Sequence, residues 1–407
     1  MRDADRRWPQ IALGKIATIK SGGTPDRKTP AYWVDGTIPW VTTSEVNYSR
    51  ITGSKERITH IGLENSAAKI FPAGTLLMAL YGQGKTRGQV GILQMDAATN
   101  QACAAILPDP SYSVDFLFYS LQYDYEKIRA LSNSGGQDNL SAELVREIRI
   151  PRMPLPEQRK IAAILRTWDL GLEKLSALRK AKERLRNWLR TQVVTGKRRL
   201  PGFAGHWREV QLSDVLTEHG EASTGTEEVY SVSVHKGLIN QIEHLGRSFA
   251  AASTDHYNRV LPGDIVYTKS PTGDFPLGII KQSQVKHPVI VSPLYGVFTP
   301  IRRELGVLLE AHFEAPLAVK NYLNPLVQKG AKNTIAITNK RFLEGKLHLP
   351  LDPKEQKAIA AIIETSRREL DAIDREIAAL TRQKRGLMQK LLTGEWAVQP
   401  DLETANV

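Results

Sequence analysis

The chain has 407 residues, which is enough for two or three folding units with hydrophobic cores. Hydrophobic residues make up 41% of it, and this content excludes a largely disordered chain. Lys and Arg outnumber Asp and Glu by 55 to 43, giving a net charge of +12. This balance favours a polyanionic partner, with nucleic acid first, although a basic composition also serves solubility alone.

The sequence shows no sign of a membrane segment or of cysteine chemistry. Residues 1–10 are charged, and no apolar run reaches the roughly 18 residues of a membrane span. We therefore expect a soluble, cytoplasmic protein. The single cysteine, Cys103, excludes an internal disulfide and a cysteine-based zinc cluster. Its apolar neighbours predict a buried structural thiol.

Residues 8–150 are predicted to form a first α+β domain, which we call domain 1. Short apolar runs at 76–80, 90–93 and 104–107 predict strands, and residues 114–131 predict a helix. Polar loops lie between these elements, at 21–25, 42–44, 81–87 and 133–139.

The loops of domain 1 carry side chains that can read base edges in a DNA groove. Arg and Lys pair with guanine, Asn and Gln with adenine, and Ser or Thr with either. The alternative is that such residues are simply what turns are made of. The candidate DNA-binding residues are Thr24, Thr42, Thr43, Ser44, Tyr81, Gln83, Lys85, Thr86, Arg87, Gln137 and Asn139.

One loop in domain 1 ends like a phosphate-binding loop, with Gly84-Lys85-Thr86. Position 79 is Ala where that motif requires Gly, and the residues that follow predict a strand where the motif opens a helix. Nucleotide binding is therefore disfavoured. The nine histidines show no metal-ligand spacing, and no catalytic constellation is present. We expect no catalytic residue, no metal and no cofactor bound by this chain.

Residues 151–196 are predicted to be dominated by a long helix. Apolar side chains recur at spacings of three and four over residues 156–195, which places them on one helix face. Gly196 suits the position just after a helix end. The apolar face consists of Ile161, Ile164, Trp168, Leu172, Leu175, Leu185 and Leu189.

The second half repeats this organisation after a linker at residues 197–206. Residues 207–350 predict a second α+β domain, domain 2, with strands at 265–267, 278–280 and 296–298. Its candidate DNA-binding residues are Lys269, Ser270, Thr272, Lys332, Asn333 and Lys340.

Residues 351–394 predict a second long helix, followed by a tail at residues 395–407. Asp352 offers a capping side chain, Pro353 suits the first turn, and Gly394 suits the C-terminal end. The apolar face of this helix consists of Ile359, Ile362, Leu370, Ile373, Ile377, Leu380, Leu387 and Leu391.

An internal repeat of 198 residues relates the two halves. Residues 157–164 (EQRKIAAI) match residues 355–362 (EQKAIAAI), and Thr195-Gly196 recurs as Thr393-Gly394. Two helices of equal length in one chain predict mutual antiparallel packing as a coiled coil of about 60 Å. The alternative is that each helix lies across its own domain. Residues 156–195 and 354–393 carry +9 of the net charge, so the pair is basic.

Domain 1 carries several short motifs in a fixed order: Gly23-Thr24-Pro25, Tyr32-Trp33 and Ile38-Pro39-Trp40, followed by the run 154–162 (PLPEQRKIA). In these motifs the chain resembles the specificity subunits of type I restriction-modification enzymes. Domain 2 lacks the first and third of these motifs. The resemblance covers essentially the whole chain, because the motifs occur in order and the helices are doubled.

The resemblance implies a non-catalytic subunit in which each domain reads one half of a bipartite DNA site. The helices would set the spacing and dock two methyltransferase subunits, with two restriction subunits beyond them. S-adenosylmethionine, ATP and Mg would then belong to those partners. The alternatives are the recognition subunit of a related type II system that fuses methylase and nuclease, and a coiled-coil scaffold unrelated to DNA.

Overall fold

The computed structural model describes residues 8–82, 84–132, 139–245, 254–329 and 335–399. The chain forms two compact units: unit 1 contains residues 1–175 and 376–407, and unit 2 contains residues 176–375. Each of the two long helices therefore contributes one part to each unit. The domain boundaries expected from the repeat stay predictions, since this division passes through the helices.

Unit 1 contains two sheets and a terminal strand pair. β1 (Gln10–Ala12) pairs with β11 (Arg149–Pro151) and so joins the start of domain 1 to its end. The larger sheet has the order β2 (Ala17–Ser21), β10 (Cys103–Pro108), β7 (Leu76–Ala79), β8 (Val90–Leu93) and β4 (Arg50–Ile51). The smaller sheet has the order β5 (Glu56–Ile58), β3 (Ile38–Val41), β9 (Ala97–Thr99) and β6 (Ile70–Phe71).

Two of the short helices of unit 1 pack against the larger sheet, one on β8 and one on β2. The segment expected as one helix at 114–131 is two helices that meet at Asp124, so that expectation is corrected. The reason is local: Asp124 leaves the helical conformation and ends the first helix while it begins the next. The short α-helices among the described residues are α1 (His60–Glu64), which lies beside the smaller sheet, α2 (Val114–Tyr123), α3 (Tyr125–Leu131) and α4 (Ala142–Glu147).

Unit 2 is built on one four-stranded sheet with several strand pairs around it. The sheet has the order β13 (Leu216–Thr217), β20 (Gly296–Pro300), β17 (Ile265–Tyr267) and β18 (Ile280–Gln282). The pairs are β12 (Arg208–Gln211) with β23 (Lys346–Leu349), β14 (Tyr230–Ser233) with β15 (Gly237–Asn240), β16 (Asn258–Val260) with β19 (Val289–Val291), and β21 (Gln328–Lys329) with β22 (Ile335–Ala336). The helices are α6 (Gln241–Leu245), α7 (Arg303–Phe313), α8 (Pro316–Leu323) and α9 (Asn339–Glu344).

The central sheets of the two units share one topology, which confirms two similar α+β domains. The order β2-β10-β7-β8 in unit 1 matches β13-β20-β17-β18 in unit 2. In both, the last two strands form an antiparallel hairpin, and the final pairs of these hairpins are Met78 with Val90 and Tyr267 with Ile280. The repeat found in the sequence is therefore also a repeat of strand order.

The two long helices are α5 (Leu155–Leu189), which continues into a π-helical turn (Arg190–Val194), and α10 (Pro353–Leu392). Gly196 and Gly394 follow them with φ of 70° and 77°, a left-handed conformation that glycine adopts at low cost. The Asp352 carboxylate accepts a 2.8 Å hydrogen bond from the Lys354 amide and caps α10. The expected helix ends are confirmed.

The repeated Glu-Gln pair has a structural role at the start of each long helix. Gln158 is fully buried, and its amide donates to the Met153 carbonyl at 2.9 Å. Gln356 is 6% exposed and donates to the Pro350 carbonyl at 2.8 Å. In both copies the glutamine satisfies a backbone carbonyl that precedes the helix, which a buried segment requires.

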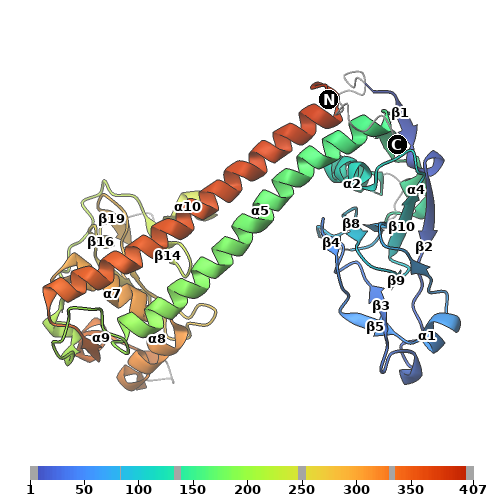
Figure 1. The fold of residues 1–407 in the computed structure, drawn as a ribbon. Coiled ribbons are helices and arrows are strands. Elements are labelled where there is room, and N and C mark those ends of the chain that lie inside the picture. The colour runs from blue at the N-terminus through green and yellow to red at the C-terminus, as the bar shows by residue number, and fades with distance from the viewer. Residues whose placement is uncertain (1–7, 83, 133–138, 246–253, 330–334, 400–407) are drawn as a thin grey trace. The chain divides into compact units, whose positions relative to one another are not determined.

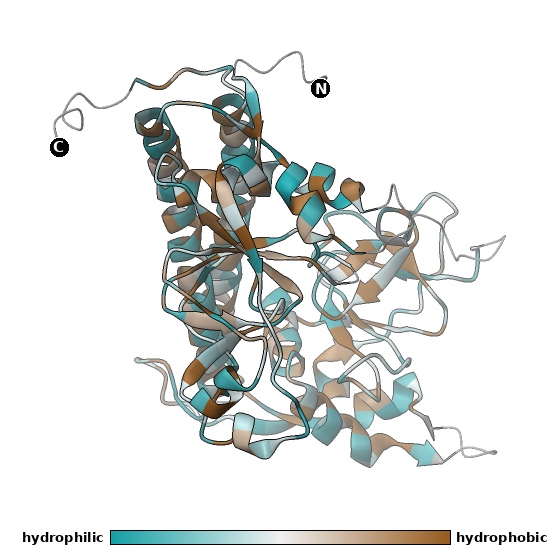
Figure 2. Cartoon of the chain, turned by 90° about the vertical axis from the view of Figure 1, so that its right-hand side faces the viewer, coloured by the Kyte–Doolittle hydropathy of each residue, from teal (hydrophilic) through white to brown (hydrophobic). Residues whose placement is uncertain are grey.

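In both units α5 and α10 pack side by side and antiparallel (Figure 1), as expected of a coiled coil. In unit 1 Asp169 pairs with Lys384; in unit 2 Arg179 pairs with Asp374, and Lys182 pairs with Glu369 at 2.9 Å. Residue numbers thus rise along one helix as they fall along the other. In Figure 2 the helices alternate between brown and teal, as amphipathic helices do.

The ends of the long helices also enter the domain cores, so the alternative of packing across a domain is partly right. In unit 1 Ile161 and Leu165 of α5 and Leu391 of α10 join the core of domain 1. In unit 2 Ile359 and Ile363 pack with Val307 and Ala311 of α7. Ile164, Trp168, Leu172, Leu175, Leu189, Ile362, Ile373, Ile377, Leu380 and Leu387 are half-buried, and Leu370 is buried.

Leu185 departs from the expected apolar face of α5. Its side chain is 47% exposed, because the helix turns it toward the rim of the helix pair. Among the described residues, no helix is both long and apolar enough to cross a membrane.

Candidate nucleic-acid interface

The hairpin loop between β7 and β8 of unit 1 presents the largest group of candidates in domain 1. Tyr81 and Lys85 are exposed, whereas Thr86 and Arg87 are half-buried. The loop closes through the Gly88 amide, which donates to the Ala79 carbonyl at 2.8 Å. This arrangement places a cation and an aromatic ring at the surface of one hairpin.

A tyrosine outside the loop holds its backbone in place. The Tyr125 hydroxyl donates to the Lys85 carbonyl at 2.5 Å, and Arg129 donates to the Tyr125 oxygen at 2.7 Å. The Lys85 side chain remains exposed. A fixed backbone with an outward cation is suited to contact a phosphate or a guanine edge.

The same loop lacks the backbone geometry of a phosphate-binding motif. Gly84-Lys85-Thr86 leads into β8, which pairs antiparallel with β7. A phosphate-binding loop instead opens a helix, whose N-terminal amides hold the phosphates. No described group of three or more His, Cys, Asp or Glu side chains could hold a metal ion.

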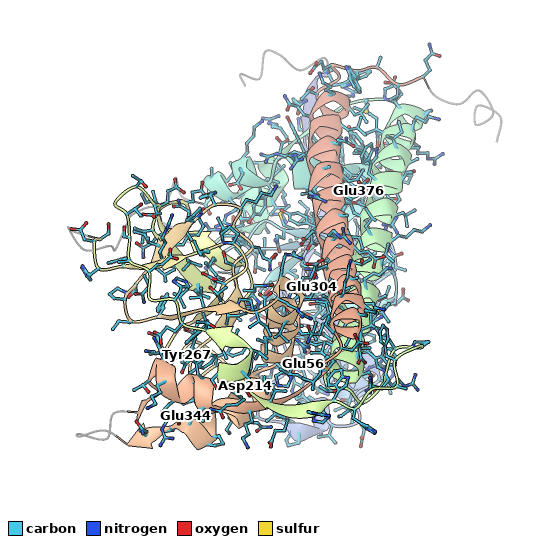
Figure 3. The ribbon with its side chains drawn as sticks, turned by 90° about the vertical axis from the view of Figure 1, so that its left-hand side faces the viewer. Glu56, Asp214, Tyr267, Glu304, Glu344 and Glu376 are labelled. Atoms are coloured by element: carbon cyan, nitrogen blue, oxygen red, sulfur yellow. The ribbon has the colours of Figure 1, made fainter. Side chains whose placement is uncertain are left out.

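Unit 2 carries an equivalent loop between β17 and β18. Lys269, Ser270 and Thr272 are all exposed on it. The Tyr267 hydroxyl, labelled in Figure 3, donates to the Leu277 carbonyl at 2.8 Å and holds the loop from within. Partial burial of the ammonium lowers the pKa of Lys269, against the attraction of the Glu218 carboxylate. The cationic candidates of the two domains thus lie on matching hairpins.

A second segment lies beside the hairpin in each domain. In unit 1 the Leu140 amide donates to the Leu80 carbonyl at 3.0 Å, so the exposed Asn139 lies next to the loop. In unit 2 Asn339 at the start of α9 donates to Glu218 at 2.5 Å, and the exposed Lys340 follows it. In unit 1 the hairpin loop therefore lies beside the segment before α4. In unit 2 the first residue of α9 contacts Glu218, whose carboxylate also attracts Lys269 of the hairpin loop.

A separate group of candidates lies beside the smaller sheet of unit 1. The Thr24 hydroxyl donates to Gln101, and Thr43 is half-buried. The Thr42 and Ser44 hydroxyls donate to the Glu45 carboxylate at 2.6 and 3.0 Å. The Thr42 and Ser44 hydroxyls are therefore engaged within their own loop.

Glu45 is the acceptor at the centre of that loop. Its burial acts to raise the carboxyl pKa, but hydrogen bonds from Thr42, the Lys55 amide and Ser44 outweigh this and lower the pKa. The carboxylate therefore stays ionised and stabilises the loop.

Four candidates, Gln83, Gln137, Lys332 and Asn333, lie outside the described residues. The DNA-contact role of the other candidates stays a prediction. Sequence reasoning missed Tyr125 and Tyr267, which hold the two hairpin loops. Tyr267 could have been found from the repeated strands, because it is the last residue of β17 and so borders the hairpin loop. Tyr125 lies on a helix, and no local sequence pattern marks it.

Comparisons with known proteins point to one family. Residues 6–182 match the model described as "Type I restriction modification DNA specificity domain". The chain is 21% identical to the type I restriction enzyme MjaIX specificity subunit of Methanocaldococcus jannaschii, over 96% of this chain and 94% of that protein.

Solved structures show the same fold. The S subunit of a type I restriction-modification system from M. genitalium superposes with a TM-score of 0.59 and 16% identity, over 95% of this chain and 96% of that one. A structure described in terms of complex assembly and conformational transition of the type I system has a TM-score of 0.55 and 16% identity, over 96% and 98% of the two chains.

Proposed function

We propose that the chain is a specificity subunit of a type I restriction-modification enzyme and that its two domains each read one half of a bipartite DNA site. Recognition of a DNA sequence is the task of this family. Here domain 1 and domain 2 would dock on separate half-sites, with phosphate contacts fixing register and loop side chains selecting bases.

One observation carries this proposal. Two domains with the same strand order present a lysine on matching hairpin loops, Lys85 on one and Lys269 on the other. The other loop residues differ, with Thr86 and Arg87 in domain 1 and Ser270 and Thr272 in domain 2. Equivalent placement supports an equivalent task, and different loop residues support different half-site sequences. The net charge of +12 adds a general attraction to the DNA backbone.

We further propose that the long helices set the spacing between the half-sites. Both helices are continuous through the residues at which the two units divide. An α-helix rises 1.5 Å per residue, so α5 alone measures about 50 Å. Half-sites on one face of the duplex lie about 34 Å apart from centre to centre.

The helices also offer a surface on which a methyltransferase subunit would dock. In unit 2 a groove of about 300 Å³ runs between α5 and α10, lined by Leu185, Leu189 and Ile362 among others. Trp188 nearby is 45% exposed. Apolar side chains at the rim of a charged helix pair are typical of a protein interface.

The specificity-subunit family is non-catalytic. We propose that methylation and cleavage come from two methyltransferase and two restriction subunits that assemble with this chain. S-adenosylmethionine, ATP and Mg would be bound by those subunits, and the complex would work in the cytoplasm, where it meets DNA.

An exchange of domain 1 tests the proposal. Residues 8–150 would be replaced by the corresponding residues of another family member, and methylation sites would be mapped in a genome that carries the chain and its partner subunits. We expect a bipartite site of which only one half changes. A change in both halves, or in neither, would overturn the assignment of one half-site to each domain.

Two alternatives predict other results. The recognition subunit of a type II system that fuses methylase and nuclease would be encoded beside one large fused enzyme, and not beside separate methyltransferase and helicase-nuclease genes. A coiled-coil scaffold unrelated to DNA would show no preferred duplex at any salt concentration, whereas a specific reader keeps its preferred site as affinity falls with salt.

A further inference from the structure

A buried ion cluster fastens domain 2 to the long helices within unit 2. Glu314, just after α7, lies 2.6 Å from a guanidinium nitrogen of Arg186 on α5 and 2.9 Å from one of Arg367 on α10. Arg190 approaches the same carboxylate at 3.4 Å. Glu310, one turn earlier on α7, lies 2.8 Å from Arg367. We call these residues the domain 2 clamp.

The corresponding positions in unit 1 carry a different set of charges. At the repeat distance of 198 residues, Arg367 corresponds to Asp169, and Lys384 corresponds to Arg186. Asp169 of α5 and Lys384 of α10 form an ion pair directly between the two helices. Domain 1 contributes a neutral group, the Tyr119 hydroxyl, which donates to Asp169 at 2.6 Å.

At these matching positions the two helices carry opposite charges in unit 1, on Asp169 and Lys384. In unit 2 they carry two positive charges, on Arg186 and Arg367. Arg186 and Arg367 repel each other, and the negative charge that holds both comes from domain 2, through Glu310 and Glu314. The side chains of these two glutamates are only 7% and 13% exposed, so solvent screens the interaction weakly.

A further cation, Lys281, adds to the positive charge that Glu310 and Glu314 offset. Lys281 on β18 is 8% exposed and lines the same cavity of about 700 Å³ as Arg186, Glu314 and Arg367. Burial acts to raise the pKa of Glu314, but Arg186, Arg367 and Lys281 outweigh it and lower that pKa. Glu364 and Asp371 of α10 also line this cavity, and Glu364 pairs with Arg303 at 2.6 Å. Within the clamp itself, the three arginines and Lys281 outnumber the two glutamates even when both are ionised.

We propose that Glu310 and Glu314 are positioning residues that hold α5 and α10 together at Arg186 and Arg367. Elsewhere in unit 2 the helices pair directly, through Arg179 with Asp374 and Lys182 with Glu369. At the matching position in unit 1, Asp169 and Lys384 pair without an acidic residue from the domain. Each domain then fits the charges of its own helix segment. If domain 1 took the place of domain 2 against the helices of unit 2, it would bring the Tyr119 hydroxyl to Arg186 and Arg367. These arginines would then have no carboxylate from the domain. This inference goes beyond the proposed function and does not depend on DNA binding.

Hydrogen exchange on the full chain tests the clamp. In the double variant Glu310→Gln and Glu314→Gln, the arginines lose their counter-charge. Amide exchange in residues 177–189 and 359–371 should accelerate about tenfold or more, because an uncompensated buried charge is strongly destabilising. Residues 161–173 and 376–388 should keep their rates. The matched control is Glu344→Gln in the same unit (Figure 3), whose carboxylate pairs with Arg341 on α9, away from the clamp.

A charge exchange separates the clamp from ordinary packing. Adding Arg367→Asp to the double variant would let Arg186 face a carboxylate, as Lys384 faces Asp169 in unit 1. We expect slow exchange in residues 177–189 and 359–371 to return, even where the double variant alone fails to fold. Unchanged exchange in the double variant, or no recovery in the triple variant, would overturn the proposal. Because no DNA is used, neither outcome bears on the proposed reading of half-sites.

Discussion

The Tyr119 hydroxyl on α2 donates a hydrogen bond of 2.6 Å to the Asp169 carboxylate on α5. Tyr119 is 1% exposed, so this bond joins the core of domain 1 to a long helix. Tyr119→Phe should lower the free energy of unfolding by about 1 to 2 kcal/mol, because the acceptor is charged. Urea denaturation followed by circular dichroism measures the change.

Tyr112→Phe is the matched control for Tyr119→Phe. Its ring is 9% exposed and its hydroxyl is buried without a hydrogen-bond partner among the described residues. Removing that oxygen should leave stability unchanged or raise it slightly. Equal losses in both variants would mean that the Asp169 bond contributes nothing of its own.

Lys85→Ala should weaken binding to a duplex that carries the selected site. If the ammonium contacts a phosphate, the slope of log affinity against log salt concentration should fall by about one. Fluorescence anisotropy at several salt concentrations measures it. Lys69→Ala, an exposed lysine beside the smaller sheet of unit 1, serves as the control. An equal slope in both variants would show that Lys85 does not contact the DNA. Nucleotide binding by the wild type that is lost in Lys85→Ala would instead support the phosphate-loop hypothesis.

Gly278→Ala should disrupt the β17–β18 hairpin of domain 2. Gly278 has φ of 102°, and an added Cβ would lie 1.7 Å from the Thr268 carbonyl oxygen. We expect a loss of about 2 kcal/mol or more in stability and weaker reading of one half-site only, measured by thermal unfolding and by duplex selection. Gly273→Ala in the same loop has open space around its Cβ at φ of 50°, and should cost about 1 kcal/mol.

Glu45→Gln should destabilise domain 1 in a pH-dependent way. The pKa of Glu45 lies below the ordinary glutamate value of 4.5, so the ionised carboxylate adds stability above that pH. This contribution is lost as the pH falls through the folded pKa. The difference between wild type and variant in urea denaturation should therefore be largest near neutral pH and shrink below pH 4.5. Glu64→Gln, an exposed residue, should show no such difference.

Lengthening the helices tests the spacer. Seven residues inserted after Leu175 in α5 must be matched by seven after Asp374 in α10, since the helices are antiparallel and one insertion alone would shift their register. Two added turns give about 10 Å, or about three base pairs. Duplex selection should then favour a longer spacer with both half-sites intact, at lower affinity because one half-site turns around the duplex. If the selected spacer stayed the same, helix length would not set the distance between the half-sites.

Much of the architecture was predictable from the sequence, because in a long helix the apolar residues recur at regular spacings. Ile161, Leu391 and their neighbours repeat at spacings of three and four, and Gly196 and Gly394 mark the ends. The strands at 76–79, 90–93 and 265–267 were visible as apolar runs for the same reason. The break at Asp124 could not be predicted from the sequence, since a single residue that leaves helical geometry does not change the apolar pattern.

The candidate surface was only partly predictable, because turn chemistry and base-reading chemistry use the same residue types. The sequence could place Thr42 and Ser44 in a polar loop, but their commitment to Glu45 depends on the folded backbone.

The sequence by itself determined the two helices, the two similar domains and their excess of positive charge, because periodicity, repeats and composition are properties of the linear chain. Only the tertiary structure decided which side chains meet. It placed Glu310 and Glu314 between Arg186 and Arg367, and it put the Lys85 carbonyl beside the Tyr125 hydroxyl. These contacts join residues far apart in the chain, and a charge acts over the few ångströms that folding sets rather than over sequence distance.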